Sequence, residues 1–113
     1  VQAGRGTLYV NLEEAGLLCQ CEFDSSVRAA EALLARGAAR IVVTDGGNPA
    51  TAADPDTAVT QTPPPVSVTR VTGAGDTFMA AHIAAELRGL APAGALDAAL
   101  SAAALYVSGE TKI

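Results

Sequence analysis

The sequence contains no tryptophan and only 4% aromatic residues, although apolar residues make up 50% of it. Alanine dominates the apolar set, and this composition favours a helix-rich soluble domain packed through small side chains. A chain of 113 residues is long enough to bury roughly two-thirds of its unfolded surface. We therefore expect a single domain over residues 1–113.

Long apolar runs are missing as well. No run approaches the roughly 18 apolar residues that a membrane-spanning helix requires. The first residues also lack the basic start and the apolar block of a secretory signal. The sequence therefore predicts a cytoplasmic protein with no membrane partner.

Basic residues are scarce and do not form a run. The chain has 7 Lys and Arg against 12 Asp and Glu, which makes the formal net charge −5. Nucleic-acid backbones are bound through clustered basic side chains, so this pattern argues against a nucleic-acid partner. It leaves room for a single bound nucleotide, because backbone amides and a metal ion can hold a polyphosphate.

Cysteine is nearly absent too. Cys19 and Cys21 are two positions apart, an unusual spacing for a structural disulfide, and no neighbouring Cys or His completes a metal-binding set. We interpret both as unreactive thiols.

What the sequence does have is a small-residue turn that leads directly into a predicted helix. Residues 71–78 read Val-Thr-Gly-Ala-Gly-Asp-Thr-Phe. Small side chains let the backbone approach a ligand, and the amides of a first helical turn have no intrahelical partner. The helix dipole adds partial positive charge there, so the turn predicts an anion site. Asp76 either complements the dipole or takes a proton from an attacking hydroxyl.

Two further polar segments follow predicted strands. The β-prone residues 8–10 lead into Asn11 and Glu14, and the β-branched residues 40–44 lead into Gly46. Open α/β sheets place ligands at the carboxyl ends of their parallel strands. An alternative stays open for each segment: Asn11 caps a helix whose first turn carries Glu13 and Glu14, and residues 46–49 form an ordinary reversing turn.

The remaining elements follow from caps, breakers and periodicity. A helix is expected from the Asp24-Ser25-Ser26 cap cluster to Gly37, a hairpin over residues 51–61, and a surface link at the prolines 63–65. Residues 1–6 are expected to form a loop and residues 66–69 the last strand. Two helices should follow. The first should end at Arg88 and Gly89 and bury Ala80, Ile83, Ala84 and Leu87, with His82 off that face. The second should run between Pro92 and Gly109 and bury Leu96, Leu100, Ala103 and Val107.

Residues 73–78 resemble the GAGD signature of the ribokinase-like (PfkB) carbohydrate kinases. Asn11 with Glu14 resembles the NxxE motif of that family, and Thr44 with Gly46 resembles its T-x-G loop. The three motifs occur in the family's order and match its C-terminal part. The resemblance implies a ribokinase-like three-layer α/β/α fold with a mainly parallel sheet flanked by helices. It also implies that residues 1–113 are the nucleotide-binding part, without the N-terminal acceptor-binding part.

The resemblance also implies a role for each motif residue. Asp76 would be the catalytic base, and Gly73, Ala74 and Gly75 would form the anion hole. Thr44 and Gly46 would flank the phosphates of ATP, together with Gly73 and Gly75. Asn11 and Glu14 would organise Mg²⁺, usually through water.

The chain departs from the family pattern mildly at His82, which stands where the family usually has an apolar residue, and more clearly at two other places. Pro49 and Ala50 stand where the T-x-G loop commonly has another glycine, and Arg70 stands where the family often has Asp or Asn. The second departure argues against a monovalent-cation site there.

The implied activity is phosphorylation of a sugar or nucleoside hydroxyl, including that of pseudouridine, by ATP. The alternative is a non-catalytic nucleotide- or phosphate-binding domain, and a plain structural domain is a third reading. The oligomeric state stays open, with a homodimer as one option.

Overall fold

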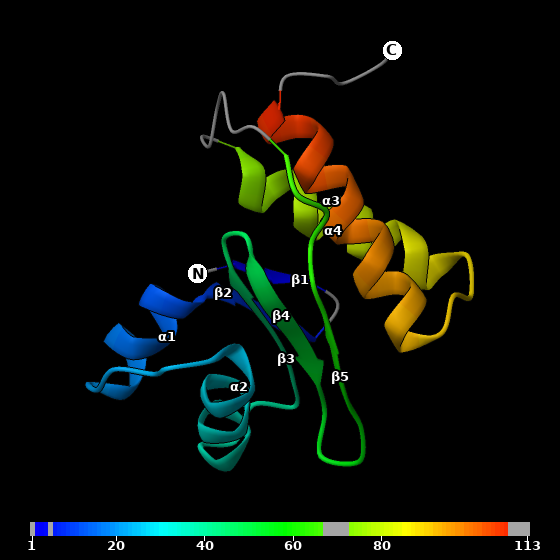
Figure 1. Ribbon diagram of the computed structural model, residues 1–113. Helices are drawn as coiled ribbons and strands as arrows, with labels where there is room; N and C mark the ends of the chain where they lie inside the picture. The colour runs from blue at the N-terminus through cyan, green and yellow to red at the C-terminus, as the bar shows by residue number, and fades with distance from the viewer. Residues whose placement is uncertain (1, 5, 67–72, 109–113) are drawn as a thin grey trace. The chain divides into compact units, whose positions relative to one another are not determined.

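The computed structural model describes residues 2–4, 6–66 and 73–108 (Figure 1). The chain divides into two compact units, Val1–Gln61 and Thr62–Ile113. The first unit is an α/β unit built on a sheet, and the second contains a helical pair. Each unit is described by itself.

The sheet of the first unit has five strands in the order β1-β2-β3-β4-β5. These strands are β1 (Gln2–Gly4), β2 (Thr7–Asn11), β3 (Arg40–Asp45), β4 (Asn48–Ala53) and β5 (Ala58–Gln61). Among these described strands, only β2 and β3 pair in parallel, while the other neighbours are antiparallel. The prediction of a mainly parallel sheet is therefore wrong. Short turns join β3 to β4 and β4 to β5, and a short turn can connect only antiparallel strands.

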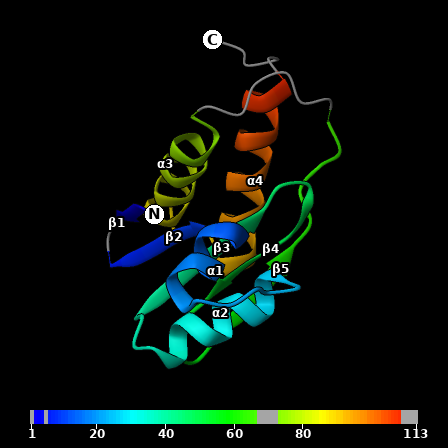
Figure 2. The same cartoon turned by 90° about the vertical axis from the view of Figure 1, so that its left-hand side faces the viewer.

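Two helices form the connection between the parallel strands β2 and β3. They are α1 (Leu12–Cys19) and α2 (Ser26–Ala35), and both pack against the sheet (Figure 2). Their apolar faces and the strand residues beneath them form one core that includes Val10, Ile41 and Val43. The β-branched run of β3 is buried at Ile41, Val42 and Val43, as expected for a central strand.

Buried hydroxyl groups tie α2 to the hairpin of β4 and β5. Ser26 Oγ donates to the Pro49 carbonyl at 2.8 Å and lies 2.8 Å from Thr51 Oγ1. Thr51 Oγ1 in turn lies 3.0 Å from Thr60 Oγ1 on β5. The predicted hairpin is confirmed, and the Asp54 carboxylate accepts the amides of its turn, with donors at residues 56 and 57.

The second unit contains α3 (Ala74–Leu87) and α4 (Pro92–Ser108), which lie side by side (Figures 1 and 2). Arg88 is the C-cap of α3 and Gly89 has φ 84°, so the predicted end of this helix is confirmed. Leu96 and Leu100 of the predicted stripe on α4 are buried, while Ala103 and Val107 are half-buried.

The buried face of α3 differs from the prediction. Its buried residues are Phe78, His82 and Ala85, whereas Leu87 is 64% exposed. The His82 ring stacks on Phe78 with an interplanar angle of 7° and a centroid distance of 6.1 Å, and its Nδ1 lies 3.8 Å from Glu86 Oε1. Apolar residues of α3 occur on all sides of the helix, so their spacing in the sequence could not identify the buried side.

Two smaller predictions are also wrong. Residues 2–4, expected in a loop, form β1 because they pair with β2. Val27, which the helical spacing of Val27, Ala30, Leu33 and Leu34 in the sequence groups with the apolar face of α2, is 40% exposed.

Several predictions lie outside the described residues: the strand at 66–69 beyond Val66, the residue Arg70, and the helix end at Gly109. Within the described ranges, no helix combines the length and the apolar character that crossing a bilayer requires.

Candidate active site

The carboxyl ends of the parallel strands β2 and β3 meet at one edge of the sheet. Their register places Asn11 directly opposite Thr44. After Asn11 the chain enters α1, and after Thr44 it passes Asp45 and turns at Gly46. Two polar segments far apart in the sequence therefore lie side by side, as expected for strand ends in an α/β sheet.

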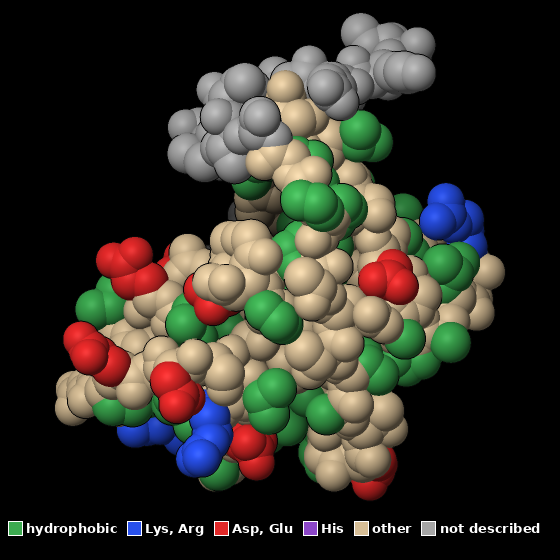
Figure 3. Space-filling model, viewed as in Figure 1, with side chains coloured by type: hydrophobic (Ala, Val, Ile, Leu, Met, Phe, Trp, Pro, Cys, Tyr) green, Lys and Arg blue, Asp and Glu red, His purple; other side chains and the backbone are tan. Residues whose placement is uncertain are grey.

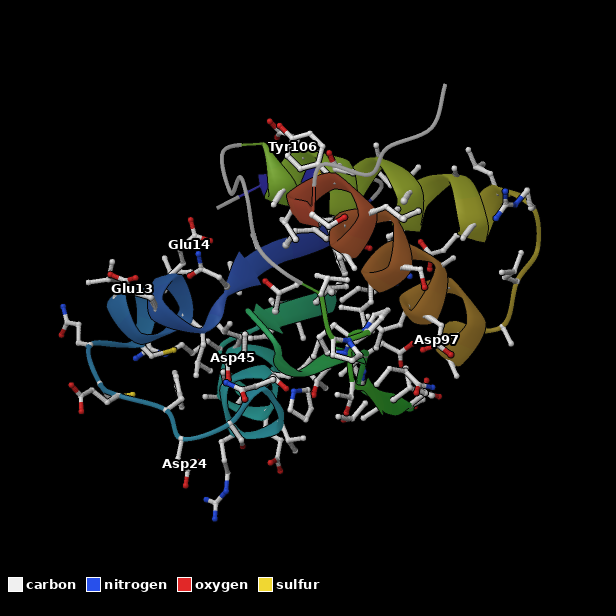
Figure 4. All side chains as sticks on the ribbon, turned by 45° about the horizontal axis from the view of Figure 1, so that its top comes forward. Glu13, Glu14, Asp24, Asp45, Asp97 and Tyr106 are labelled. Carbon is white, nitrogen blue, oxygen red and sulfur yellow. The ribbon has the colours of Figure 1, made fainter. Side chains whose placement is uncertain are left out.

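Asn11 and Glu14 form a reciprocal capping box at the start of α1. Asn11 Oδ1 accepts the Glu14 N–H at 2.7 Å, and Glu14 Oε1 accepts the Asn11 N–H at 2.9 Å. The helix-cap interpretation is thus confirmed. Figure 4 shows Glu13 and Glu14 on the first turn of α1. Glu14 is half-buried and Glu13 is exposed, so the cap fixes only one of these two carboxylates.

The donor set at this edge fits an indirect role around Mg²⁺. Among the described residues, no group of three or more His, Cys, Asp or Glu side chains could hold a metal ion. Mg²⁺ does not require such a cage, because it keeps several waters and needs only one or two carboxylates beside substrate phosphates. Glu14 supplies a carboxylate, while the Asn11 side-chain oxygen is already used by the cap.

The turn after Thr44 is a two-residue hairpin loop. Gly46 has φ 56°, and the strand pairing resumes with Asp45 opposite Asn48 after an irregularity between Val43 and Asp45. A Cβ atom at Gly46 or Gly47 would meet no other atom within 4 Å. The reversing-turn interpretation is therefore confirmed, and phosphate binding by Thr44 and Gly46 stays a prediction.

The second unit provides the start of α3. Gly73 is its N-cap, with φ 89° and ψ −3°, and it makes no side-chain cap hydrogen bond. The first intrahelical bond runs from the Thr77 N–H to the Gly73 carbonyl at 3.0 Å. The amides of Ala74, Gly75 and Asp76 precede this bond, and they are the amides that a helix leaves without an intrahelical partner.

Asp76 lies in the first turn of α3, and its side chain is exposed. The predicted transition from a glycine turn into a helix is thus confirmed. Its carboxylate and the first-turn amides lie on the same helical turn. This turn can stabilise negative charge through its amides and can accept a proton through its carboxylate.

One further residue lies beside this turn, and the local sequence does not predict it. Tyr106, in the last turn of α4, lies so close to Gly73 that a Cβ atom at position 73 would be 2.6 Å from the Tyr106 hydroxyl oxygen. The only signal in the sequence is the rarity of aromatic residues, since the chain has just two tyrosines.

Charged side chains on the visible face of the molecule are mixed in sign. Figure 3 shows acidic and basic groups interspersed around α1 and α2, without a continuous basic patch among the described residues on that face. This pattern agrees with the net charge of −5.

The chain matches the profile of the pfkB family carbohydrate kinases over residues 6–112. A search of the curated proteins finds no match. Among solved structures, the chain is similar to the ribokinase of Thermotoga maritima, with 26% identity and a TM-score of 0.80. That alignment covers 91% of this chain and 36% of the ribokinase.

Two further structures resemble the chain. A proposed ribokinase II of Escherichia coli in complex with ATP and Mg²⁺ is 27% identical, with a TM-score of 0.76, over 91% of this chain and 33% of that one. Phosphofructokinase-2 of Escherichia coli, in complex with substrates and products, is 22% identical, with a TM-score of 0.78, over 90% and 34%.

The chain therefore spans about a third of the length of these kinases. The similarity confirms the ribokinase-like α/β fold class. Because the family profile covers nearly all of the chain, the protein belongs to the pfkB family of carbohydrate kinases.

Proposed function

We propose that this chain is the C-terminal, nucleotide-binding part of an ATP-dependent kinase that phosphorylates a hydroxyl group of a sugar or nucleoside. Membership of the pfkB family supports the class of reaction. The similarity to a structure in complex with ATP and Mg²⁺ supports the phosphoryl donor and the metal. Residues that contact the acceptor would lie mainly in the part of a kinase that this chain does not span.

The observation that carries the proposal is the start of α3. Its N-cap is a glycine at positive φ, which leaves the first turn without a side-chain cap, and Asp76 stands in that same turn. First-turn amides and the helix dipole suit a phosphoryl group that gains negative charge during transfer. A carboxylate on the same turn suits a hydroxyl that loses its proton.

The proposed chemistry divides between these groups. Asp76 accepts the proton of the acceptor hydroxyl as the oxygen attacks the γ-phosphorus of ATP, while the bond from that phosphorus to the β–γ bridging oxygen breaks and ADP leaves. The amides of the N-cap Gly73 and of Ala74 and Gly75 at the start of α3 stabilise the charge on the transferred group. Positioning supplies most of the rate, because phosphoryl transfer needs little covalent chemistry from the protein.

The edge of β2 and β3 would serve the metal and the phosphates. Glu14, held by the capping box, would orient water molecules around Mg²⁺, and Asn11 would act by holding Glu14. Mg²⁺, when bound, neutralises phosphate charge. Thr44 and Gly46 would line the phosphate side of this edge, where the turn has open space around Gly46.

A second candidate function is nucleotide binding without transfer. It is favoured by the length of the chain, which covers only 33% to 36% of the compared kinases. A domain of this kind would hold ATP at the α3 start but would have no acceptor beside Asp76.

Phosphoryl transfer from ATP to a panel of sugars and nucleosides separates these functions, with ATP affinity measured in parallel. Transfer to one acceptor class, dependent on Mg²⁺, would support the kinase. ATP binding without transfer to any acceptor would support the second candidate. A protein that folds but does not bind ATP would contradict both.

A further inference from the structure

Tyr106 lies against the glycine that begins α3. A Cβ atom at position 73 would lie 2.6 Å from the Tyr106 hydroxyl oxygen, 3.2 Å from Cζ and 3.6 Å from Cε2. The first of these distances is far below van der Waals contact, so the hydroxyl end of the phenol group occupies the space that a side chain at position 73 would need. Both residues belong to the second unit, where α3 and α4 pack together.

The arrangement of the helical pair makes this contact possible. The last turn of α4 lies beside the first turn of α3, and Figure 4 shows Tyr106 on that last turn, close to the beginning of α3. A large planar side chain on a packed helix provides a rigid wall, since an aromatic ring has only two rotatable side-chain bonds.

Gly73 needs such support because a glycine backbone can leave its conformation for many others. Its φ of 89° is easily reached by glycine, but glycine also reaches most other conformations at little cost. Nothing in the covalent structure of glycine therefore holds this turn in one shape. The ring of Tyr106 restricts the turn from the side on which a Cβ atom would stand.

We propose that Tyr106 is a positioning residue, which holds the Gly73 turn so that the first amides of α3 and Asp76 keep the orientation required for phosphoryl transfer. This inference rests on the proposed function for its consequence in catalysis. The contact with Gly73 is a property of the folded chain and does not depend on a ligand.

Three variants test the proposal in the full-length protein. Tyr106→Ala removes the ring, and Tyr106→Phe keeps the ring and removes only the hydroxyl. Leu105→Ala is the matched control, because Leu105 is the preceding residue on the same turn of α4 and is 49% exposed. The measurements are hydrogen exchange, without nucleotide, of the Thr77 amide that donates to the Gly73 carbonyl, affinity for ATP with Mg²⁺, and kcat and KM where transfer occurs.

We expect Tyr106→Ala to speed exchange of the Thr77 amide, whose acceptor is the Gly73 carbonyl, and to lower kcat by about 10- to 100-fold, as expected from small misplacements of catalytic groups. Tyr106→Phe should give intermediate values of both properties, because Cζ and Cε2 remain while the hydroxyl oxygen, the atom nearest to position 73, is lost. Leu105→Ala should resemble the unmodified protein. A residue with only a structural role would lower thermal stability without changing kcat in the folded enzyme.

The outcomes also separate this inference from the proposed function. If the unmodified protein does not bind ATP, the proposed function fails. Faster exchange in Tyr106→Ala, without the same change in Leu105→Ala, would still support the inference that Tyr106 holds the Gly73 turn. If exchange in Tyr106→Ala equals that in Leu105→Ala, the inference is overturned, whatever the protein binds. Unchanged kcat and ATP affinity in Tyr106→Ala would overturn its role in positioning.

Discussion

The starts of α1 and α3 resolve the same physical problem in different ways. Each helix begins with amides that have no intrahelical partner. At α1, Asn11 and Glu14 close the helix end with two reciprocal hydrogen bonds, of 2.7 Å and 2.9 Å. At α3 the N-cap is Gly73, which has no side chain to offer, and Asp76 is exposed in the first turn.

This difference separates a helix end that stabilises the fold from one that is open to a ligand. A capping box stabilises the helix and fixes the orientation of its carboxylate, here that of Glu14. An end that begins with glycine gives up that stabilisation but lets a phosphate approach the amides directly. In the proposed kinase, α1 would thus orient groups around the metal, while α3 would bind the transferred phosphoryl group.

The largest expected effect comes from Asp76→Asn. The amide side chain cannot accept the proton of the acceptor hydroxyl, so we expect turnover to fall by about 10²- to 10⁴-fold. The measurement is kcat for transfer from ATP in the full-length protein. Asp97→Asn is the control, since Asp97 is an exposed carboxylate on α4 and lies outside the proposed site. Equal kcat values in both variants would remove Asp76 from the role of base.

Next in size is the effect of Glu14→Gln. Glutamine can still accept the Asn11 N–H, so the cap and the thermal stability should change little. The lost charge should weaken the apparent affinity for Mg²⁺ by about 10- to 100-fold, as for other groups that act on a metal through its ligands. A titration of activity or ATP binding with Mg²⁺ measures this change.

Glu13→Gln provides the matched comparison for that experiment. Glu13 is in the same helical turn and is exposed, but it is outside the capping box. Its replacement should leave the Mg²⁺ dependence unchanged. If both variants shift the Mg²⁺ dependence equally, the effect comes from general charge near the helix end, and the specific role of Glu14 is wrong.

A smaller effect, with opposite signs in two measurements, is expected for Gly75→Ala. Alanine is the better helix former, so the free energy of unfolding should rise by up to about 1 kcal/mol. The added methyl group should obstruct the approach of phosphate to the first-turn amides and weaken ATP binding about tenfold, or ~1.4 kcal/mol. Chemical denaturation and calorimetric titration with ATP measure the two changes.

Gly94→Ala is the control for this substitution. Gly94 is near the start of α4, and a Cβ atom there would make ordinary contacts of 3.6 Å or more with Leu90. It should therefore raise stability in a similar way without affecting ATP. A loss of ATP affinity in both variants would show that helix stiffness matters, and it would contradict close approach of phosphate at Gly75.

The smallest expected effect is that of Asn11→Ala on stability. Loss of Asn11 Oδ1, which accepts the Glu14 N–H, should lower the free energy of unfolding by about 1 kcal/mol. The Mg²⁺ dependence should change little, because alanine keeps the backbone N–H that donates to the Glu14 carboxylate. Ser25→Ala, which removes the N-cap side chain of α2, should lower stability by a similar amount, because Ser25 Oγ accepts the Arg28 N–H at 3.3 Å. A Mg²⁺ response weakened as much in Asn11→Ala as in Glu14→Gln would contradict this, and it would mean that the backbone N–H of residue 11 is not sufficient to position Glu14.

Much of the candidate site could be predicted from local sequence. Asn11 precedes a helix with Glu14 three positions later, which is a capping box, and the glycines before Asp76 predict the start of α3. The β-branched run before Thr44 likewise predicts β3. These features depend on contacts between residues a few positions apart, so the local sequence predicts them.

By itself, then, the sequence determined the helix caps, the buried β-branched strand, the two hairpin turns and the family to which the motifs belong. Only the tertiary structure decided that Asn11 lies opposite Thr44, that the sheet is mixed, and that His82 is buried. It also brought Tyr106 against Gly73. Such contacts join residues far apart in the chain, and an alanine-rich sequence offers many nearly equivalent packing faces, so only the folded chain selects among them.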